Sequence, residues 1–133
     1  MLNSKSQILN SKQIQNTKSQ KPTYDLEERT FIFAKRCRNY VLKLPRTISN
    51  IEYGKQLIRA SGSIAANYIE ANESLSKKDY IMRTKICRKE TKESRMWLKL
   101  AQPTEENQKE AELLIQETNE LMKIFGSILE KCK

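Results

Sequence analysis

Two glutamates, Glu90 and Glu93, lie three positions apart in a segment whose pattern predicts a helix, so their carboxylates would share one side of it. Paired carboxylates can perform acid–base catalysis when a nucleophile, a base or a metal ion accompanies them. The chain has no histidine, and therefore no Glu-x-x-His motif of the kind that builds di-iron sites in helical bundles. We predict a non-enzymatic protein with no catalytic residue, no metal and no cofactor. Both glutamates are interpreted as partners for Arg59 or for a cation of a neighbouring subunit.

The segment "RASGSIAANYIEANES" at residues 59–74 allows two interpretations, a phosphate-binding loop or a helix with small side chains. The loop is disfavoured because the GxxxxGK[ST] pattern, whose backbone surrounds phosphate groups, is missing. The small residues surround the whole helical circumference, which favours close packing on more than one side, with Arg59, Asn67 and Glu70 as polar pairing groups. The helix has two apolar sides: one with Ile51, Ile58, Gly62, Ala65 and Ile69, the other with Tyr53, Leu57, Ile64, Tyr68 and Ala71.

Positive charge is the strongest binding signal. The chain has 25 Lys and Arg against 16 Asp and Glu, and its net charge of +9 favours a polyanionic partner such as nucleic acid, although solubility alone would also account for it. Cations recur at helical spacing in two predicted helices, and such rows can contact successive phosphates. No recognition-helix motif accompanies them, so base-edge contacts are not predicted. The predicted nucleic-acid-binding residues are Arg29, Lys35, Arg36, Arg38, Lys43, Lys85, Arg88, Lys92, Arg95 and Lys99.

The elements that must position these side chains are predicted from helix start and stop signals. Residues 1–22 repeat NSK, NSK and NTK, contain no acid, and are predicted to form a disordered tail. In residues 23–133, apolar residues recur at helical spacing in four stretches with short connectors, which favours antiparallel neighbours. The predicted fold is all-α, an antiparallel up-down-up-down four-helix bundle. Its helices are expected from near Asp25 to Pro45, from a cap at Asn50 to about Asn72, from a cap at Ser76 to Pro103, and from Thr104 onward.

The third predicted helix has more apolar surface than a monomeric bundle requires. One side, which includes Thr84, Cys87 and Leu98, is assigned to the bundle core. A second apolar stripe lies on the far side, and Trp97 would anchor an oligomer interface there, because aromatic residues dominate interface energetics. The alternative is that Trp97 widens the core. The predicted interface residues are Met82, Ile86, Trp97 and Leu100.

The chain shows no signal for export or membrane insertion. Its first residues lack the apolar core of a secretory signal, and no apolar run approaches the ~18 residues of a membrane span. Cys37, Cys87 and Cys132 are scattered and form no CxxC pair, which favours reduced thiols. We therefore predict a cytoplasmic protein that does not contact membranes.

Three long segments resemble a known family: "YDLEERTFIFAKRCRNYVLKLP" (24–45), "RASGSIAANYIEANESLSKKDY" (59–80) and "KICRKETKESRMWLKL" (85–100). They are similar to the small four-helix bundle proteins encoded within bacterial 23S rRNA intervening sequences. The likeness covers about residues 24–102 well and the fourth helix loosely. Two departures are visible: RASGSIAAN in place of the family's RSGTSIGAN, and Met96 where an aromatic residue usually precedes the tryptophan.

The resemblance implies an antiparallel four-helix bundle that assembles into a homopentameric ring. The family also resembles the accessory protein of diversity-generating retroelements, a basic pentameric bundle that contacts nucleic acid and the reverse transcriptase. Together with the positive charge, this implies nucleic-acid binding. The alternative is a protein-interaction scaffold, for example an accessory subunit of a reverse transcriptase or another nucleic-acid enzyme.

Overall fold

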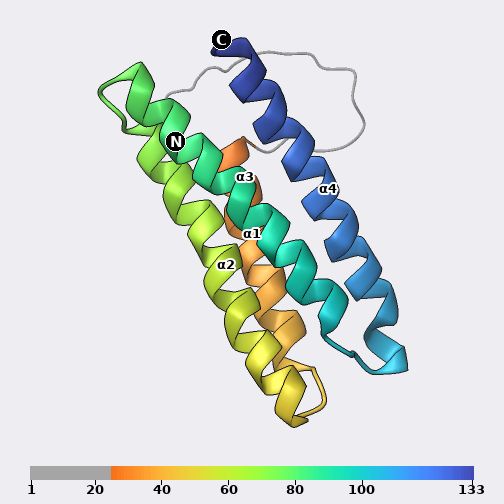
Figure 1. Cartoon of the computed structure of the whole chain (residues 1–133). Helices are drawn as coiled ribbons and strands as arrows, with labels where there is room; N and C mark the ends of the chain where they lie inside the picture. The colour runs from red at the N-terminus through yellow and green to blue at the C-terminus, as the bar shows by residue number, and fades with distance from the viewer. Residues whose placement is uncertain (1–24) are drawn as a thin grey trace.

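The computed structural model describes residues 25–133, which form four long helices and one short 3-10 helix (Figure 1). Consecutive helices are antiparallel neighbours, and α4 returns beside α1. The predicted all-α, up-down-up-down four-helix bundle is confirmed, whereas the predicted tail, residues 1–22, lies outside the described residues. The helices are α1 (Leu26–Leu42), α2 (Ile48–Asn72), α3 (Lys77–Leu100), η1 (Glu105–Asn107) and α4 (Gln108–Lys131).

Local capping chemistry sets two of the helix starts as the sequence predicts. Asp25 accepts a hydrogen bond from the N–H of Glu28 at 2.8 Å, and Ser76 accepts one from the N–H of Asp79 at 3.1 Å. The fourth helix differs, because the chain after Thr104 first forms the 3-10 helix η1 and the α-helix begins only at Gln108. A 3-10 turn at a helix N-terminus is a common tightening of the first turn.

The prediction that Asn50 caps the second helix is wrong. Thr47 is the cap, since its hydroxyl accepts a hydrogen bond from the N–H of Asn50 at 3.1 Å, and α2 begins at Ile48. The buried side chain of Asn50 donates to the carbonyl oxygens of Pro45 at 2.9 Å and Gln102 at 3.0 Å. Its Oδ1 also accepts from the N–H of Gln102 at 2.9 Å. One amide therefore ties the α1–α2 connector to the α3–α4 connector.

The segment "RASGSIAANYIEANES" is helical as far as Asn72, as the sequence predicts. The predicted close packing on more than one side is not seen within the described chain, because Gly62 and Ala66 are exposed. Ser61 and Ile64 are buried in the bundle. The side of α2 that carries Leu57 and Ile64 enters the core, but the side that carries Ile58 remains exposed. Among the four described helices, none combines the length and the apolar character needed to cross a membrane.

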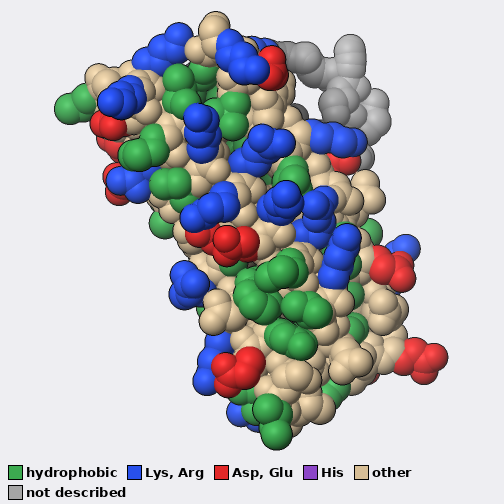
Figure 2. Space-filling view, in the orientation of Figure 1, with side chains coloured by type: hydrophobic (Ala, Val, Ile, Leu, Met, Phe, Trp, Pro, Cys, Tyr) green, Lys and Arg blue, Asp and Glu red, His purple; other side chains and the backbone are tan. Residues whose placement is uncertain are grey.

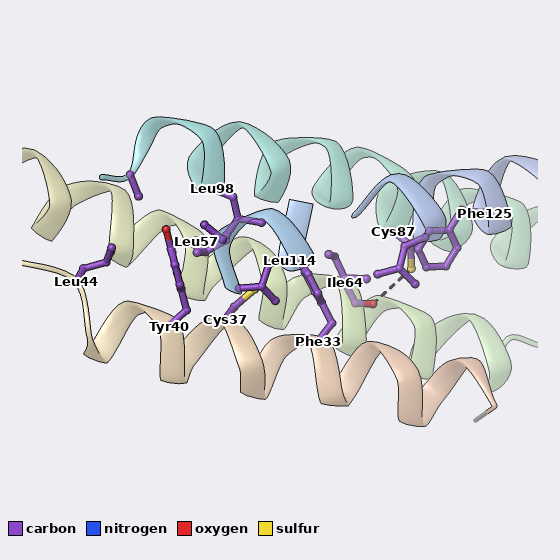
Figure 3. Close-up of a cluster of buried hydrophobic side chains, with 13 residues drawn as sticks. Phe33, Cys37, Tyr40, Leu44, Leu57, Ile64, Cys87, Leu98, Leu114 and Phe125 are labelled. Atoms are coloured by element: carbon purple, nitrogen blue, oxygen red, sulfur yellow. Dashed lines mark hydrogen bonds between the residues drawn. The ribbon is translucent and has the colours of Figure 1, made fainter. Parts of the chain in front are cut away.

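The core extends along the bundle axis as a cluster of buried apolar side chains (Figure 3). Four threonines are buried with it: Thr30, Thr84, Thr91 and Thr118. Phe33, Leu114 and Phe125 are buried, and full burial of such a side chain contributes about 1.5–3 kcal/mol. The hydroxyls of Thr84 and Thr91 donate to backbone carbonyls one turn earlier, at 2.8 and 2.7 Å, so these polar groups are satisfied inside an apolar environment. The core side predicted for the third helix is confirmed.

Candidate nucleic-acid interface

Four of the predicted phosphate-binding cations form a row on the outer side of α3. Lys85, Arg88, Lys92 and Lys99 are all exposed, and the row extends over roughly 21 Å at 1.5 Å per residue. Within residues 25–133, none of these four forms an ion pair. Figure 2 shows Lys and Arg side chains gathered over α3. We call these four residues the α3 row; their charges are available to a polyanion.

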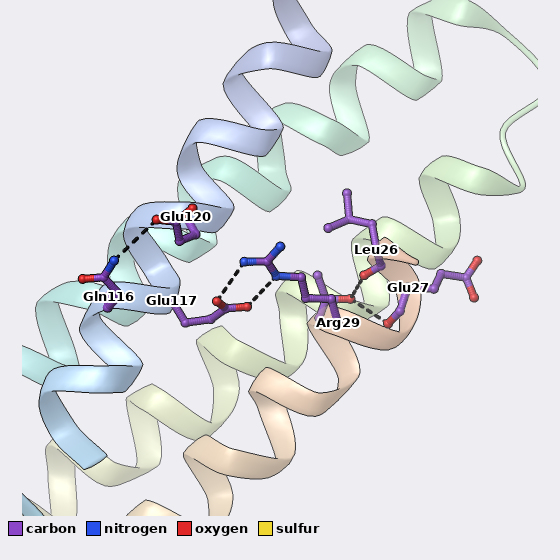
Figure 4. Close-up of polar contacts among 7 residues, drawn as sticks. Leu26, Glu27, Arg29, Gln116, Glu117 and Glu120 are labelled. Carbon is purple, nitrogen blue, oxygen red and sulfur yellow. Dashed lines mark hydrogen bonds and ion pairs between the residues drawn. The ribbon is translucent and has the colours of Figure 1, made fainter. Parts of the chain in front are cut away.

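Two arginines of α1 that the sequence assigns to phosphate binding are instead engaged within the bundle. Arg29 binds the Glu117 carboxylate through Nε at 2.7 Å and Nη2 at 3.0 Å (Figure 4). Arg36 binds Glu110 in the same way, at 3.1 and 3.2 Å. Both pairs join α1 to α4, the neighbouring helices that pack least extensively. Because both guanidinium groups are paired with carboxylates, they are less available to phosphates than the α3 row.

The electrostatics of these internal contacts fit a structural role. The hydrogen bonds that Arg29 donates to the Glu117 carboxylate raise the pKa of Arg29, against the opposing effect of burial. The pairs are bidentate but partly exposed, so each contributes about 1 kcal/mol or less. Arg95 of α3 is also used internally, since it is partly buried and donates to Asn119 Oδ1 of α4 at 2.7 Å. It borders the α3 row without belonging to it.

The remaining α1 cations point away from the α3 row. Lys35, Arg38 and Lys43 are exposed, and Lys35 Nζ lies 5.6 Å from the ring centre of Phe31. Each of α1 and α3 packs against α2 and α4, so α1 and α3 occupy the diagonal of the bundle and their outer sides face opposite directions. The two rows predicted from the sequence are therefore two separate surfaces, and one straight duplex cannot contact both in a single protomer.

The predicted interface residues of α3 lie beside the α3 row, where hydrophobic side chains are visible next to the cations (Figure 2). Met82 and Leu100 are exposed and Ile86 is half-buried. Trp97 is also half-buried, and its ring centre lies 6.1 Å from that of Tyr53 on α2. Trp97 thus packs against the core while part of its surface stays exposed.

The polar groups predicted to pair on α2 behave differently from one another. Asn67 donates to the carbonyl and hydroxyl oxygens of Ser63 at 2.9 and 3.0 Å, and its Oδ1 accepts from Arg83 at 2.9 Å. Arg83 was missed by the sequence analysis, because its partner lies on another helix and no local spacing identifies it. Glu70 is exposed at the surface of α2.

The structure does not bring Arg59 to either predicted glutamate partner. Arg59 donates to Gln56 of its own helix at 3.4 Å. Glu90 is buried, and the cation that pairs with it is the adjacent Lys89, at 3.7 Å. Among residues 25–133, Glu93 forms no ion pair. A cation from a second subunit stays a prediction for both carboxylates.

The two buried cysteines, Cys37 and Cys87, are unsuited to nucleophilic chemistry at neutral pH. All three are free, and burial raises the pKa of the Cys37 and Cys87 thiols to about 12, so both stay protonated. Within the described part of the chain, no three His, Cys, Asp or Glu side chains are placed to hold a metal ion. Charge and apolar surface are thus the binding features that the described residues offer.

Residues 23–127 match the family model of the 23S rRNA-intervening sequence proteins. The chain belongs to this family. The match extends from the start of α1 into α4 and includes the whole α3 row. A solved structure of a protein of unknown function from the S23 ribosomal protein family of Bacteroides thetaiotaomicron VPI-5482 is similar, with a TM-score of 0.69 and 30% identity over 77% of this chain and 96% of that chain. No curated protein sequence matches.

Proposed function

We propose that this member of the 23S rRNA-intervening sequence family is a non-enzymatic, cytoplasmic homo-oligomer that binds the nucleic-acid backbone through the α3 row. The observation that carries the proposal is the set of four exposed cations, Lys85, Arg88, Lys92 and Lys99, which have no acidic partner among the described residues. The family is named after 23S rRNA, which makes RNA the first probe to use.

Binding through the α3 row is electrostatic and should depend steeply on salt. A protomer that neutralises four phosphates gives a slope of log affinity against log salt of about −3.6 on duplex DNA and about −2.8 on a single strand. Between 50 and 200 mM salt, the duplex slope corresponds to a loss of affinity of about a hundredfold. An oligomer that presents several rows to one strand would show a steeper slope.

Reversing two charges at the centre of the α3 row should abolish most of this binding. In Arg88→Glu/Lys92→Glu, two attractive contacts become repulsive, so we expect affinity for RNA and duplex DNA to fall at least about a hundredfold and the salt slope to lose about two units. Fluorescence anisotropy with labelled strands at several salt concentrations measures both quantities. Both residues are exposed, so the thermal unfolding midpoint should stay close to that of the wild type.

The control is Lys35→Glu/Arg38→Glu, which makes the same change of net charge on the opposite side of the bundle. Screening limits the influence of such distant charges, so we expect a loss below about threefold at 150 mM salt. Equal losses in the two variants would show that net charge alone governs binding. Unchanged binding by Arg88→Glu/Lys92→Glu would refute the α3 row as the site.

We propose that assembly, expected to be pentameric from the resemblance, uses the apolar stripe of Met82, Ile86, Trp97 and Leu100. In Met82→Asp/Leu100→Asp, burying two unpaired carboxylates would be costly, so native mass spectrometry should detect monomer in place of pentamer. Leu75→Asp is the matched control, because Leu75 is fully exposed in the α2–α3 connector and should leave the pentamer intact. A monomeric wild type, or a pentamer in the double variant, would overturn this assignment.

A further inference from the structure

α2 has an apolar side that no other helix of the described chain covers. Ile58 and Ile69 are 44% and 48% exposed, and Ile51 is half-buried on the same helical side. On α1, which packs against α2, Phe31 is 56% exposed. We call Phe31, Ile51, Ile58 and Ile69 the α1–α2 face. Exposed apolar residues grouped in this way mark interaction surfaces more often than scattered single ones do.

A pocket of about 180 Å³ lies at one end of the α1–α2 face. Val41 and Ile51 line it, and it lies where α1 and α2 approach closely: a Cβ added at Gly54 would be 2.8 Å from Val41 Cγ1. The glycine is therefore required for this approach. The charged side chains of Arg46 and Lys55 also border the pocket. An apolar side chain buried there would contribute about 1.5–3 kcal/mol.

Cations lie along the α1–α2 face between Phe31 and the pocket, whereas at its Ile69 end the exposed carboxylate of Glu27 accepts a hydrogen bond from Asn72 at 2.8 Å. Lys35, Arg38 and Arg46 are exposed, and none of them forms an ion pair within residues 25–133. Lys55 pairs only with Glu52 of its own helix, at 3.6 Å with both side chains largely exposed. A ligand for this face must therefore combine apolar side chains with negative charge.

These requirements separate the possible occupants. A phosphate backbone would use the cations but would leave Ile58 and Ile69 in water, since backbone contacts are polar. A second copy that docked this same face against it would place like charges opposite one another, which is unfavourable. A neighbour in a ring would present a different surface, and the subunit number of Ile58→Asp tests that occupant below. An amphipathic helix with acidic flanks satisfies both requirements, because it can lay an apolar side onto the α1–α2 face while its carboxylates meet the neighbouring cations.

We propose that the α1–α2 face binds an acidic amphipathic helix of a partner protein, with one apolar side chain of that helix seated in the pocket beside Arg46. This surface lies on the opposite side of the bundle from the α3 row. The proposal goes beyond nucleic-acid binding and does not depend on it, so either can fail without the other.

The test uses three labelled synthetic helical peptides with leucines at i, i+3, i+4 and i+7 and with flanks of Glu, Gln or Lys. Fluorescence anisotropy with the full-length protein should rank their affinities Glu above Gln above Lys. For the Glu-flanked peptide, Ile58→Asp and Arg46→Glu should each weaken binding at least about tenfold. Arg88→Glu/Lys92→Glu is the matched control and should bind this peptide like the wild type. Arg46 lies in an exposed connector, so its variant keeps the test valid if Ile58→Asp unfolds.

Several results would overturn the proposal. Equal affinity for the three peptides, or no binding of any of them, would exclude an acidic helix. Displacement of the peptide by RNA in Arg88→Glu/Lys92→Glu would assign the face to nucleic acid. A change of subunit number in Ile58→Asp, seen by native mass spectrometry, would assign it to contacts between copies.

Discussion

Replacing Asn50 by alanine is expected to lower the free energy of unfolding by about 3 kcal/mol, a large share of the 5–15 kcal/mol of a typical domain. The side chain makes three hydrogen bonds to the backbone of Pro45 and Gln102, and it is buried. Its loss removes the side-chain partner of the Gln102 N–H and carbonyl oxygen, whereas the Pro45 carbonyl oxygen still accepts from the N–H of Thr47 at 2.9 Å. Urea denaturation followed by circular dichroism measures the effect.

Two further variants distinguish the bonds by which Asn50 joins the two connectors from ordinary helix capping. Thr47→Ala removes only the cap of α2 and should cost about 1 kcal/mol. Asn50→Asp keeps an acceptor for the N–H of Gln102 but removes both donors and sets a carboxylate against carbonyl oxygens, so it should cost at least as much as alanine at neutral pH. If Thr47→Ala lowered the free energy of unfolding as much as Asn50→Ala does, the bonds of Asn50 to the two connectors would contribute no more than an ordinary helix cap.

Iodoacetamide is expected to modify Cys132 in the folded protein and to leave Cys37 and Cys87 unmodified. Both thiols are inaccessible, and burial raises each pKa to about 12, so at pH 8 only about one molecule in ten thousand would carry either thiolate. Cys132 is partly exposed beside the C-terminus. Mass spectrometry should count one label on the native chain and three after denaturation; rapid labelling of Cys87 in the native state would contradict the packed core.

The raised pKa values of the same two thiols predict that the free energy of unfolding falls at alkaline pH. Their pKa in the folded state is about 12 against an ordinary value of 9.0, so the folded state holds more protons than the unfolded state between these limits. Their contribution is fully present below pH 9 and is lost as the pH rises through 12, at up to about 1.4 kcal/mol per pH unit for each thiol. Burial also raises the pKa of Tyr40 to about 12, which adds to the trend.

The control for this prediction is Cys37→Ala/Cys87→Ala. This variant should be less stable at pH 7, because small cavities replace two buried side chains. Its free energy of unfolding should nevertheless fall less steeply between pH 9 and 12 than that of the wild type. Equal slopes in urea titrations at several pH values would show that the thiols do not control alkaline unfolding.

Much of the fold follows from local patterns that the sequence displays directly. The caps at Asp25 and Ser76 depend on residues three positions away, and the core side of α3 follows from helical periodicity. Local pattern also led to the wrong prediction that Asn50 caps the second helix, since asparagine is a favoured residue at helix N-termini. Of the two actual partners of Asn50, Pro45 is nearby, but Gln102 is fifty-two positions away and is reached only when the two connectors meet at one end of the bundle.

The candidate site also has features that follow from the sequence and features that depend on the tertiary structure. By itself, the sequence determined that four helices form, that α3 carries a regular row of cations beside an apolar stripe, and that the chain resembles its family. Only the tertiary structure decided that Arg29 and Arg36 bind glutamates of α4, eighty-eight and seventy-four positions away, and that the cations of α1 and α3 face opposite directions. The physical reason is that helical periodicity places a side chain around its own axis, whereas the packing of the helices decides which charges are neutralised and which stay available to a ligand.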